Sequence, residues 1–593
     1  MVSEEEEYSD NEKTIDLFSD DLLEDGGGIS GVFAIKLWID GKKIESSDIN
    51  RIEIIQTIDS HHVVKIVIHE YGFDEKENEL SDSIGYSDVL GKSISFEVEM
   101  EVPDEPRPIK STFVGIITKT QIRNRIDGIN EGIITAHGPT IAMDGARHNN
   151  FFMDQSASDV IGSILRNYPI TIGNVESTGG QMKYCVQYRE TDFEFIMRLA
   201  SGSGLYAYYD GEKFNVEKAH QSNTIELAWR YTLGGFVYGW GTASAEFTSS
   251  VYNYEQKKTF DQDSKSLPTQ SSISETSKKS TEASKKIYTE SGFSDAPKFV
   301  ADAQGLDKVL QNERNKAIGK MILCQGTCSH PQIAPGKCVK AGGLGKLDGT
   351  YWVTKVHHTF GAGSYTNKFE CTPVDVAFPK SHSARASVTN LQTAEVVDNI
   401  DPDKMGRIKV KFPWNADDTI WIRVAVPHAG QDRGWFSVPE IGDEVLVGYE
   451  QGSPDLPIVI GSLYNKDNAP HSDTGTDDNS VKGFITKSGN KIIINDSGGG
   501  EQIGIIAADG SQVIIDSGGP SITVETDGDV TIKSKNITLK ADSKIVLDGG
   551  QIEIKSGGDI KSEASMNMAT KAGIEYKIEG TMVTVKGTPI QLN

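Results

Sequence analysis

Residues 491–525 read KIIINDSGGGEQIGIIAADGSQVIIDSGGPSITVE, and short segments of the same kind continue to Asn593. Aliphatic residues alternate with polar ones, and in a β-strand this spacing places each aliphatic pair on one face. Turn signals such as Ser497-Gly498-Gly499 and Gly557-Gly558 separate the pairs. Residues 481–593 are therefore predicted to form a long series of short strands.

A single copy of this stretch lacks the residues for a core of its own. Its only aromatic residues are Phe484 and Tyr576, and it has no tryptophan or cysteine. Because each strand buries little apolar area, the strands need stacked repeats or several intertwined chains. At roughly 8 residues per strand and turn, about 14 strands would stack at about 4.8 Å each into a rod on the order of 65 Å long. We expect a narrow β-helix, and a solenoid spacer is the plainer alternative.

The composition limits the possible partners. The chain has 593 residues and a formal net charge of −26, which argues against nucleic acid or an anionic membrane as a standing partner. Residues 1–30 hold eleven acidic residues against Lys13 alone, so a disordered acidic tail is expected. Neither a signal peptide nor a run of roughly 18 apolar residues is found, so we expect assembly in the cytoplasm and export by other components.

The remaining sequence divides into two parts. Residues 31–380 have the pattern of a β-rich region with helices near 156–165 and 191–201. Residues 256–300 are rich in Ser, Lys, Thr and Glu and are expected to be a flexible insertion. A compact unit is predicted at 386–464, where glycines punctuate five short strands and Trp414, Trp421 and Trp435 are expected to supply the core.

The candidate chemical motifs are weak. Cys324, Cys328, His330 and Cys338 are residue types that bind zinc, but the C-x3-C spacing is loose and no second C-x2-C pair exists. We favour buried free thiols and keep a metal site as the alternative. Residues 26–31 match a dinucleotide-binding glycine motif, but a strand is predicted after them where a helix is needed. No motif predicts a catalytic residue, a cofactor site or a metal site.

Two stretches carry a family resemblance. Residues 187–195 read QYRETDFEF, and Gly204-Leu205-Tyr206 follows. Residues 401–410 read DPDKMGRIKV, and they are followed by FPW at 412–414, PEIGDEVLV at 439–447 and GSPDLPIVIG at 452–461. The chain resembles the VgrG family of spike proteins of type VI secretion and related contractile injection machines, over roughly residues 31–593. The second stretch is similar to the OB-fold barrel that this family shares with phage baseplate proteins.

The resemblance implies a mostly β, non-enzymatic spike protein that assembles as a homotrimer. Residues 31–380 would form a hub of two similar β-barrels with a few helices, which adapts a hexameric inner tube to a threefold spike. Residues 386–464 would form the OB barrel, 465–480 a linker, and 481–593 a triangular β-helix, or β-prism, that punctures the target membrane. The implied partners are the inner-tube protein, baseplate proteins, and a PAAR-type tip cap that carries effectors. The protein would then be secreted, or injected into a target cell, on contraction.

Three chains wound together would turn their aliphatic rows toward one axis and close their exposed strand edges. The residues predicted to form this trimer core are Ile492, Ile494, Val513, Ile515, Ile532, Ile537, Leu539, Ile545, Leu547, Ile552, Ile554, Val583 and Val585. The tip cap is predicted to bind at Thr588, Pro589, Ile590, Gln591, Leu592 and Asn593.

Several functional alternatives stay open at this point. The machine is either a membrane-anchored type VI apparatus or a free, phage-tail-like extracellular particle. A spike with built-in hydrolase activity within 256–300 and an adhesin or tail-fibre stalk are two further alternatives. Only residues 465–479 lie between the barrel and the needle, and the sequence stops at Asn593, so we expect a separate cap rather than a built-in effector domain.

Overall fold

The computed structural model describes residues 32–44, 49–69, 73–74, 79–80, 84–85, 88–101, 108–124, 130–221, 224–268, 275–294, 302–361, 364–379 and 390–591. The acidic segment 1–30 lies outside this range. The chain forms two compact units, Met1–Ala469 and Pro470–Asn593, and each is described by itself. Strands far outnumber helices, which confirms the prediction of a mostly β chain. None of the helices in the described ranges is long and apolar enough to span a membrane.

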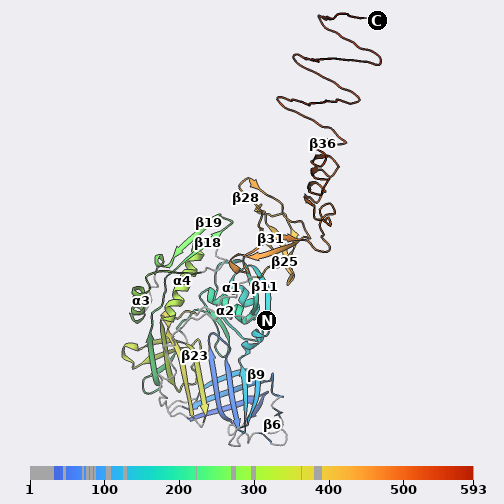
Figure 1. Cartoon of the computed structure of the whole chain (residues 1–593). Helices are drawn as coiled ribbons and strands as arrows, with labels where there is room; N and C mark the ends of the chain where they lie inside the picture. The colour runs from blue at the N-terminus through green and yellow to red at the C-terminus, as the bar shows by residue number, and fades with distance from the viewer. Residues whose placement is uncertain are drawn as a thin grey trace. The chain divides into compact units, whose positions relative to one another are not determined.

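A 13-stranded sheet dominates the first unit, in the order β17-β21-β24-β23-β3-β4-β10-β9-β8-β1-β2, with β22 on β23 and β16 on β22 (Figure 1). The strands are β1 (Val32–Ile39), β2 (Lys42–Ile44), β3 (Ile49–Thr57), β4 (Val63–His69), β8 (Ser93–Glu101), β9 (Ile109–Asn124), β10 (Asn130–His137), β16 (Ile225–Ala228), β17 (Leu233–Trp240), β21 (Ile322–Cys328), β22 (Cys338–Gly342), β23 (Gly349–Gly361) and β24 (Ser364–Pro373). A small sheet of β5 (Phe73–Asp74), β6 (Glu79–Leu80) and β7 (Ile84–Gly85) lies between β4 and β8 in the sequence.

The two halves of the large sheet each have an apolar core. One core gathers Ile52, Ile66 and Phe96, and the other gathers Val353, Phe369 and Cys371. Antiparallel pairing of β3 with β23, from Thr57 opposite Lys355 to Arg51 opposite Gly361, joins the halves. The resemblance implies two similar β-barrels here. The described strands instead form one continuous sheet, because the β3–β23 pairing satisfies the edge that each half would otherwise expose.

An α/β layer follows in the sequence, with its own core of apolar side chains. Its elements are η4 (Pro139–Asp144), β11 (Arg147–Gln155), α1 (Ala157–Leu165), β12 (Ile172–Val175), β13 (Met182–Thr191), α2 (Asp192–Gly202), β14 (Tyr206–Tyr209) and β15 (Phe214–Glu217). The helices predicted near 156–165 and 191–201 are confirmed. Ser156 caps α1, and Thr191 and Glu194 form a complete capping box at α2.

Regular structure occupies much of the region expected to be a flexible insertion. The elements around it are β18 (Phe247–Asn253), β19 (Lys258–Asp263), η5 (Ser264–Ser266), α3 (Glu275–Ile287), β20 (Gly292–Phe293) and α4 (Ala303–Lys320). Buried Arg314 on α4 donates to Glu246 at 3.2 Å and to the Ser264 carbonyl at 3.0 Å. Phe260 and Leu306 pack nearby. A polar sequence folds here because a buried ion pair and a small apolar cluster take the place of a large core.

Residues 392–463 form a closed barrel in the order β25-β26-β27-β31-β30, which confirms the predicted barrel. The strands are β25 (Gln392–Asp398), β26 (Ile408–Phe412), β27 (Asn415–Val424), β30 (Glu444–Tyr449) and β31 (Pro457–Leu463), with the short pair β28 (Ala429–Gly430) and β29 (Arg433–Gly434) and the turn η8 (Glu450–Gly452). Valine and isoleucine fill its interior. The expectation that Trp435 lies in the core is wrong, because its side chain sits beyond β29 and is 54% exposed.

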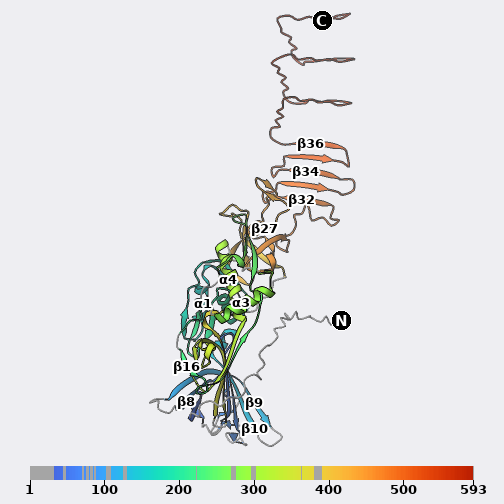
Figure 2. The same ribbon diagram turned by 90° about the vertical axis from the view of Figure 1, so that its left-hand side faces the viewer.

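The second unit begins with a five-stranded antiparallel meander (Figure 2). Its strands are β32 (Val481–Ile485), β33 (Lys491–Asn495), β34 (Gln502–Ile506), β35 (Gln512–Asp516) and β36 (Ser521–Glu525). The series of strands predicted beyond this point is not formed by one chain, since the described residues 526–591 contain no strand. A strand requires a hydrogen-bonded neighbour, and the extended passes of the chain drawn beyond β36 lie apart from one another (Figure 2).

Two further 3-10 turns complete the described structure: η6 (Gly345–Leu347) and η7 (Val374–Val376).

Candidate functional site

Residues 187–195, the first signature stretch, carry one part of the family resemblance and form a nearly buried ion pair with Arg198. Arg198 on α2 donates from Nε to Glu190 Oε1 at 2.6 Å and from Nη2 to Glu190 Oε2 at 2.7 Å. The same Nη2 donates to the Val186 carbonyl at 2.9 Å. Burial by itself would lower the pKa of Arg198, but the Glu190 carboxylate outweighs burial and the pKa is raised. The guanidinium therefore stays charged and fixes α2 against β13.

Polar residues of the same motif connect α2 to the large sheet. Asp192 accepts a hydrogen bond from Gln187 Nε2 at 2.8 Å. The Thr191 hydroxyl donates to Asp144 at the end of η4. His61, which precedes β4, has its Nε2 atom 2.8 Å from Asp144 Oδ2. Gln187, Thr191 and Asp192 are thus engaged in hydrogen bonds that hold elements together.

The backbone of β13 docks directly on the barrel. The Val186 N–H donates to Asp455 Oδ1 at 2.8 Å, although the two residues are 269 positions apart in the sequence. Gln392 Nε2 donates to the Tyr188 hydroxyl at 2.6 Å, and Gln392 Oε1 accepts from Trp414 Nε1 at 2.8 Å. Each of the two signature stretches therefore supplies one side of the junction between the α/β layer and the barrel.

Apolar and ionic contacts extend this junction. The Phe151 ring of β11 packs edge-on against Trp414 at 5.6 Å between centroids. Tyr254, at the tip of the β18–β19 hairpin, lies under the Arg423 guanidinium at 4.4 Å from its ring centroid. These contacts were not predicted from the sequence because the partners lie far apart in the chain. The position of Trp414 and Asp455 within the second signature stretch was the one indication that they have a structural role.

The second signature stretch begins at residues 401–410, which form a loop around the Asp401 carboxylate. Asp401 accepts from the backbone N–H groups of Asp403 at 3.0 Å, Met405 at 2.8 Å and Arg407 at 3.1 Å. Arg407 Nη2 also donates to Asp401 Oδ1 at 2.7 Å. Burial by itself would raise the pKa of Asp401, but these hydrogen bonds lower it to about 2. Gly406 lies at φ +74°, a conformation that glycine adopts without strain.

The cysteine cluster considered for zinc is spread over strands. Cys324, Cys328 and Cys338 are buried free thiols. Cys328 Sγ donates to Asn367 Oδ1 at 3.1 Å, and burial raises the pKa of this thiol to about 12. Burial likewise lowers the pKa of His330 to about 4. Across the described ranges, no three His, Cys, Asp or Glu side chains are grouped as metal ligands.

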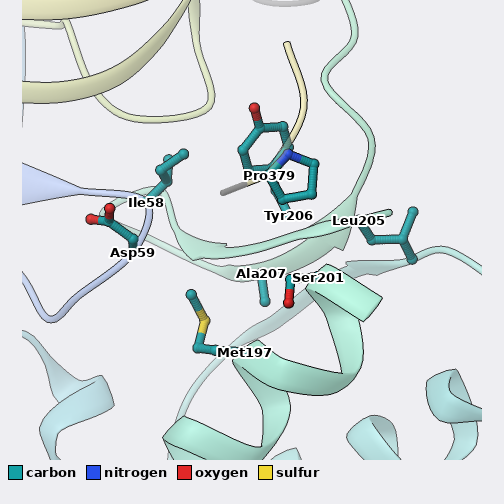
Figure 3. Close-up of a pocket in the computed structure, with 8 residues that line it drawn as sticks. All are labelled: Ile58, Asp59, Met197, Ser201, Leu205, Tyr206, Ala207 and Pro379. Carbon is teal, nitrogen blue, oxygen red and sulfur yellow. The ribbon is translucent and has the colours of Figure 1, made fainter. Parts of the chain in front are cut away.

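A small cavity lies beside the signature helix. Figure 3 shows Met197 and Ser201 of α2 on one side and Tyr206 and Ala207 of β14 close by. The cavity measures about 20 Å³, which is room for about one water molecule. Its lining residues are Ile58, Asp59, Met197, Ser201, Leu205, Tyr206, Ala207 and Pro379. A substrate does not fit in this space.

The meander of the second unit exposes one apolar face. Cross-strand pairing places large apolar side chains in two rows, each residue opposite the next. The rows are Phe484, Ile492, Ile505, Val513 and Val524, and Ile494, Ile503, Ile515 and Ile522, with exposed fractions between 38% and 73%. On the opposite face the Ile514 side chain covers Gly504, where an added Cβ would lie 2.9 Å from Ile514 Cδ1.

Four of the predicted trimer-core residues lie on this apolar face: Ile492, Ile494, Val513 and Ile515. The others are exposed on the part of the chain without strands: Ile532, Ile537, Leu539, Ile545, Leu547, Ile552, Ile554, Val583 and Val585. Of the predicted tip residues, Leu592 and Asn593 lie outside the described residues. The face also holds Ile503, Ile505, Ile522 and Val524, which follow the same alternation in the sequence.

Comparison with known proteins identifies both parts of the first unit. Residues 30–361 match the Alg8 N-terminal domain, which is more than half of the chain, and residues 392–464 match the type VI secretion system/phage-baseplate injector OB domain. The chain is 24% identical over 469 residues to the type VI secretion system spike protein VgrG1c of Pseudomonas aeruginosa, covering 71% of this chain and 62% of that protein. It therefore spans about three-fifths of the length of this relative.

Two further similarities extend this result. The chain is 24% identical over 505 residues to the actin cross-linking toxin VgrG1 of Vibrio cholerae, covering 74% of this chain and 42% of that protein. The fold is similar to the lidded Francisella PdpA–VgrG complex, with a TM-score of 0.53, 8% identity, and coverage of 83% of this chain and 80% of that chain. The chain belongs to the VgrG family of spike proteins, with an Alg8 N-terminal domain followed by an injector OB domain.

Proposed function

We propose that this chain is a structural, non-enzymatic spike that works as a homotrimer at the tip of a contractile injection apparatus. The observation that carries the proposal is the uncovered apolar face of the β32–β36 meander. Nine large apolar side chains on one face of a five-stranded sheet need a cover in water, because burying each one stabilises by about 1 kcal/mol at these exposures.

Two further copies of the same chain supply that cover and the missing strand partners. No backbone–backbone hydrogen bond joins two of the described residues between 527 and 591. The backbone N–H and C=O groups of this extended segment then form hydrogen bonds with neighbouring copies, as in a closed prism made of strands from several chains. The three apolar faces then meet at one axis, and the resulting shaft forms the membrane-puncturing needle.

The first unit is proposed to adapt the hexameric inner tube and baseplate to this threefold shaft. The support is the junction of β13 with the barrel, where Val186, Tyr188 and Trp414 contribute hydrogen bonds and buried apolar surface. A junction that combines both kinds of contact resists sliding when sheath contraction drives the tube forward. Force on the sheet region is thus passed to the barrel rather than absorbed by a hinge.

The tip is proposed to carry a PAAR-type cap and effectors, bound at Thr588–Asn593. The name of the similar Francisella structure describes a VgrG in complex with PdpA, which supports association of this family with further proteins. The V. cholerae relative is named as an actin cross-linking toxin, and we propose no such activity for this chain. The trimer assembles in the cytoplasm and leaves the cell, or enters a target cell, on contraction of a type VI apparatus; a free extracellular particle is the alternative host machine.

Light scattering of the purified chain at micromolar concentration tests the proposal. The expected mass is three times the 64.6 kDa of one copy. Electron micrographs of the same sample should show a threefold particle with a thin shaft. A stable monomer whose C-terminal 110 or so residues fold back into a globule would overturn the proposal.

A further inference from the structure

A short hairpin of the barrel leaves its side chains exposed. Its strands β28 and β29 are two residues long each. Every residue from 427 to 437 is exposed, and this includes Trp435 and Phe436, which are 54% and 81% exposed. A two-stranded hairpin is at best marginally stable in water, and exposed aromatic side chains that gather in one place are typical of a contact surface. The hairpin is therefore a candidate for binding another protein.

A loop of the second signature stretch lies beside this hairpin and adds apolar side chains to it. Gly406 lies next to the Phe436 ring, since a Cβ added at Gly406 would be 3.6 Å from Phe436 Cε2. Asn399 Nδ2 donates to the Pro439 carbonyl at 3.1 Å, so the two loops run side by side. Their large exposed apolar residues, which we call the barrel patch, are Ile400, Met405, Trp435, Phe436 and Ile441, with exposed fractions between 41% and 81%.

The backbone around the barrel patch is held in place within a single copy. The Asp401 carboxylate accepts from the Met405 N–H at 2.8 Å, which fixes the loop that carries Met405. The Trp435 N–H donates to the His428 carbonyl at 2.8 Å, which closes the base of the hairpin. A surface that is already ordered loses little conformational entropy when it binds, so even a small patch can contribute to assembly.

The barrel patch lies where the chain leaves the barrel for the meander. Asn468 Nδ2 donates to the carbonyl of Gly442, the residue that follows Ile441 of the patch, at 3.1 Å. Residues 469–480 then lead to β32, and a segment of this length spans about 40 Å at most. Copies that share one shaft therefore hold their barrel patches at an effective concentration on the order of millimolar, at which a weak contact is enough.

The charges around the barrel patch suit a second copy of the chain. The exposed residues Lys404 and Arg433 lie beside the exposed residues Asp403 and Asp432. Two chains with a net charge of −26 each repel one another in general, so a contact between them needs local charges of both signs. A rim that carries both signs lets the basic side chains of one copy face the acidic side chains of the next.

We propose that the barrel patch binds the barrel of a second copy of this chain, so that three copies are joined at their barrels as well as along the shaft. The inference rests on the proposed function and adds a second contact surface to the trimer. The three barrels then form a collar at the base of the shaft. A sideways load on one barrel is shared with the other two, whereas separately tethered barrels would each bend alone.

Hydroxyl-radical footprinting with mass spectrometry tests the proposal, because thioether and aromatic side chains react readily where water reaches them. The purified full chain is compared with Ile522→Asp, which places a charge on the apolar face of the meander and is expected to stay monomeric. Met405 and Phe436 should be labelled about fivefold more slowly in the assembled chain, because a neighbouring copy excludes water from them. Phe293 on β20, which is 67% exposed, is the control and should react equally in both proteins.

Phe484 on the apolar face of the meander separates this inference from the proposed function. Slow labelling of both Phe484 and Phe436 in the assembled chain supports the barrel contact. Slow labelling of Phe484 with Phe436 at its monomer rate would overturn the barrel contact and leave the trimer intact, and the patch would then face a different protein. An unmodified chain that is itself a monomer would overturn the proposed function as well.

A matched pair of variants measures the contribution of the barrel patch to assembly. Phe436→Ser removes a side chain that is largely exposed in one copy, so a single copy keeps its fold. It should raise the concentration at which the assembly dissociates by about tenfold and should return Met405 labelling to its monomer rate, because a central aromatic contact is lost. Phe293→Ser, the control, should change neither quantity. Equal behaviour of the two variants would contradict the inference.

Discussion

Replacing Ile522 with Asp tests whether the apolar face of the meander becomes a shared core. Ile522 lies on β36 opposite Ile515, at the end of one apolar row, and it is 73% exposed in a single copy. Thr523 follows it on the same strand, faces the opposite side and pairs with Ile514. Thr523→Asp is therefore a matched control that adds the same charge one residue away.

The expected penalty is large because it is repeated in every copy. Covering the exposed part of Ile522 stabilises an assembly by about 1.5–2 kcal/mol per copy. An aspartate at this place forfeits that gain and adds an unpaired carboxylate to an apolar interior, at several kcal/mol per copy. For three copies the total is on the order of 15 kcal/mol, comparable to the whole net stability of a typical fold.

Light scattering with size-exclusion chromatography at micromolar concentration measures the result. We expect Ile522→Asp to elute as a 64.6 kDa monomer, and Thr523→Asp to retain the oligomer of the unmodified chain. Ile545→Asp and Ile552→Asp extend the test to the part of the chain that has no strand in one copy. An Ile522→Asp protein that assembles like its control would refute the assignment of this face to the core.

Three further predictions concern the first unit. Asp455→Ala leaves the buried Val186 N–H without its acceptor and should destabilise the barrel junction by about 1–3 kcal/mol. Urea unfolding followed by tryptophan fluorescence should then have its midpoint at a lower urea concentration. An unchanged midpoint would contradict the role of this hydrogen bond. Arg198→Met leaves the Glu190 carboxylate without its partner and should lower the free energy of unfolding by about 3–5 kcal/mol. The double variant Arg198→Met with Glu190→Leu should recover most of this loss. Equal losses in the single and the double variant would argue against an ion-pair effect. The pKa of Asp401 is lower in the folded chain than its value of about 4 in the unfolded chain, so its carboxylate stabilises the fold above about pH 4, and this stability is lost as the pH falls toward about 2. Acid unfolding between pH 4 and 2 should therefore be less steep in Asp401→Asn. Identical acid profiles of the two proteins would count against this linkage.

Local patterns were enough to predict much of this protein. Alternation of aliphatic and polar residues predicted the short strands found at 481–525 and the face that each side chain occupies, because the side-chain period of a strand is two. The helix predicted near 191–201 is α2, and its start is fixed locally by the capping box of Thr191 and Glu194, since capping is decided within one turn. The quoted motifs led to the correct family and to the barrel at 392–463.

Other features depend on residues that are distant in the sequence. The meeting of Val186 with Asp455, and the continuous sheet made by β3 and β23, arise from strand pairing across hundreds of positions. The polar segment near 256–300 folds because Arg314 pairs with Glu246, a contact that composition does not reveal. Trp435 was expected inside the barrel, but closure of the barrel left its side chain outside. In the described residues 526–591 the same alternation forms no strands within one chain, because a strand exists only where a neighbouring backbone accepts and donates its hydrogen bonds.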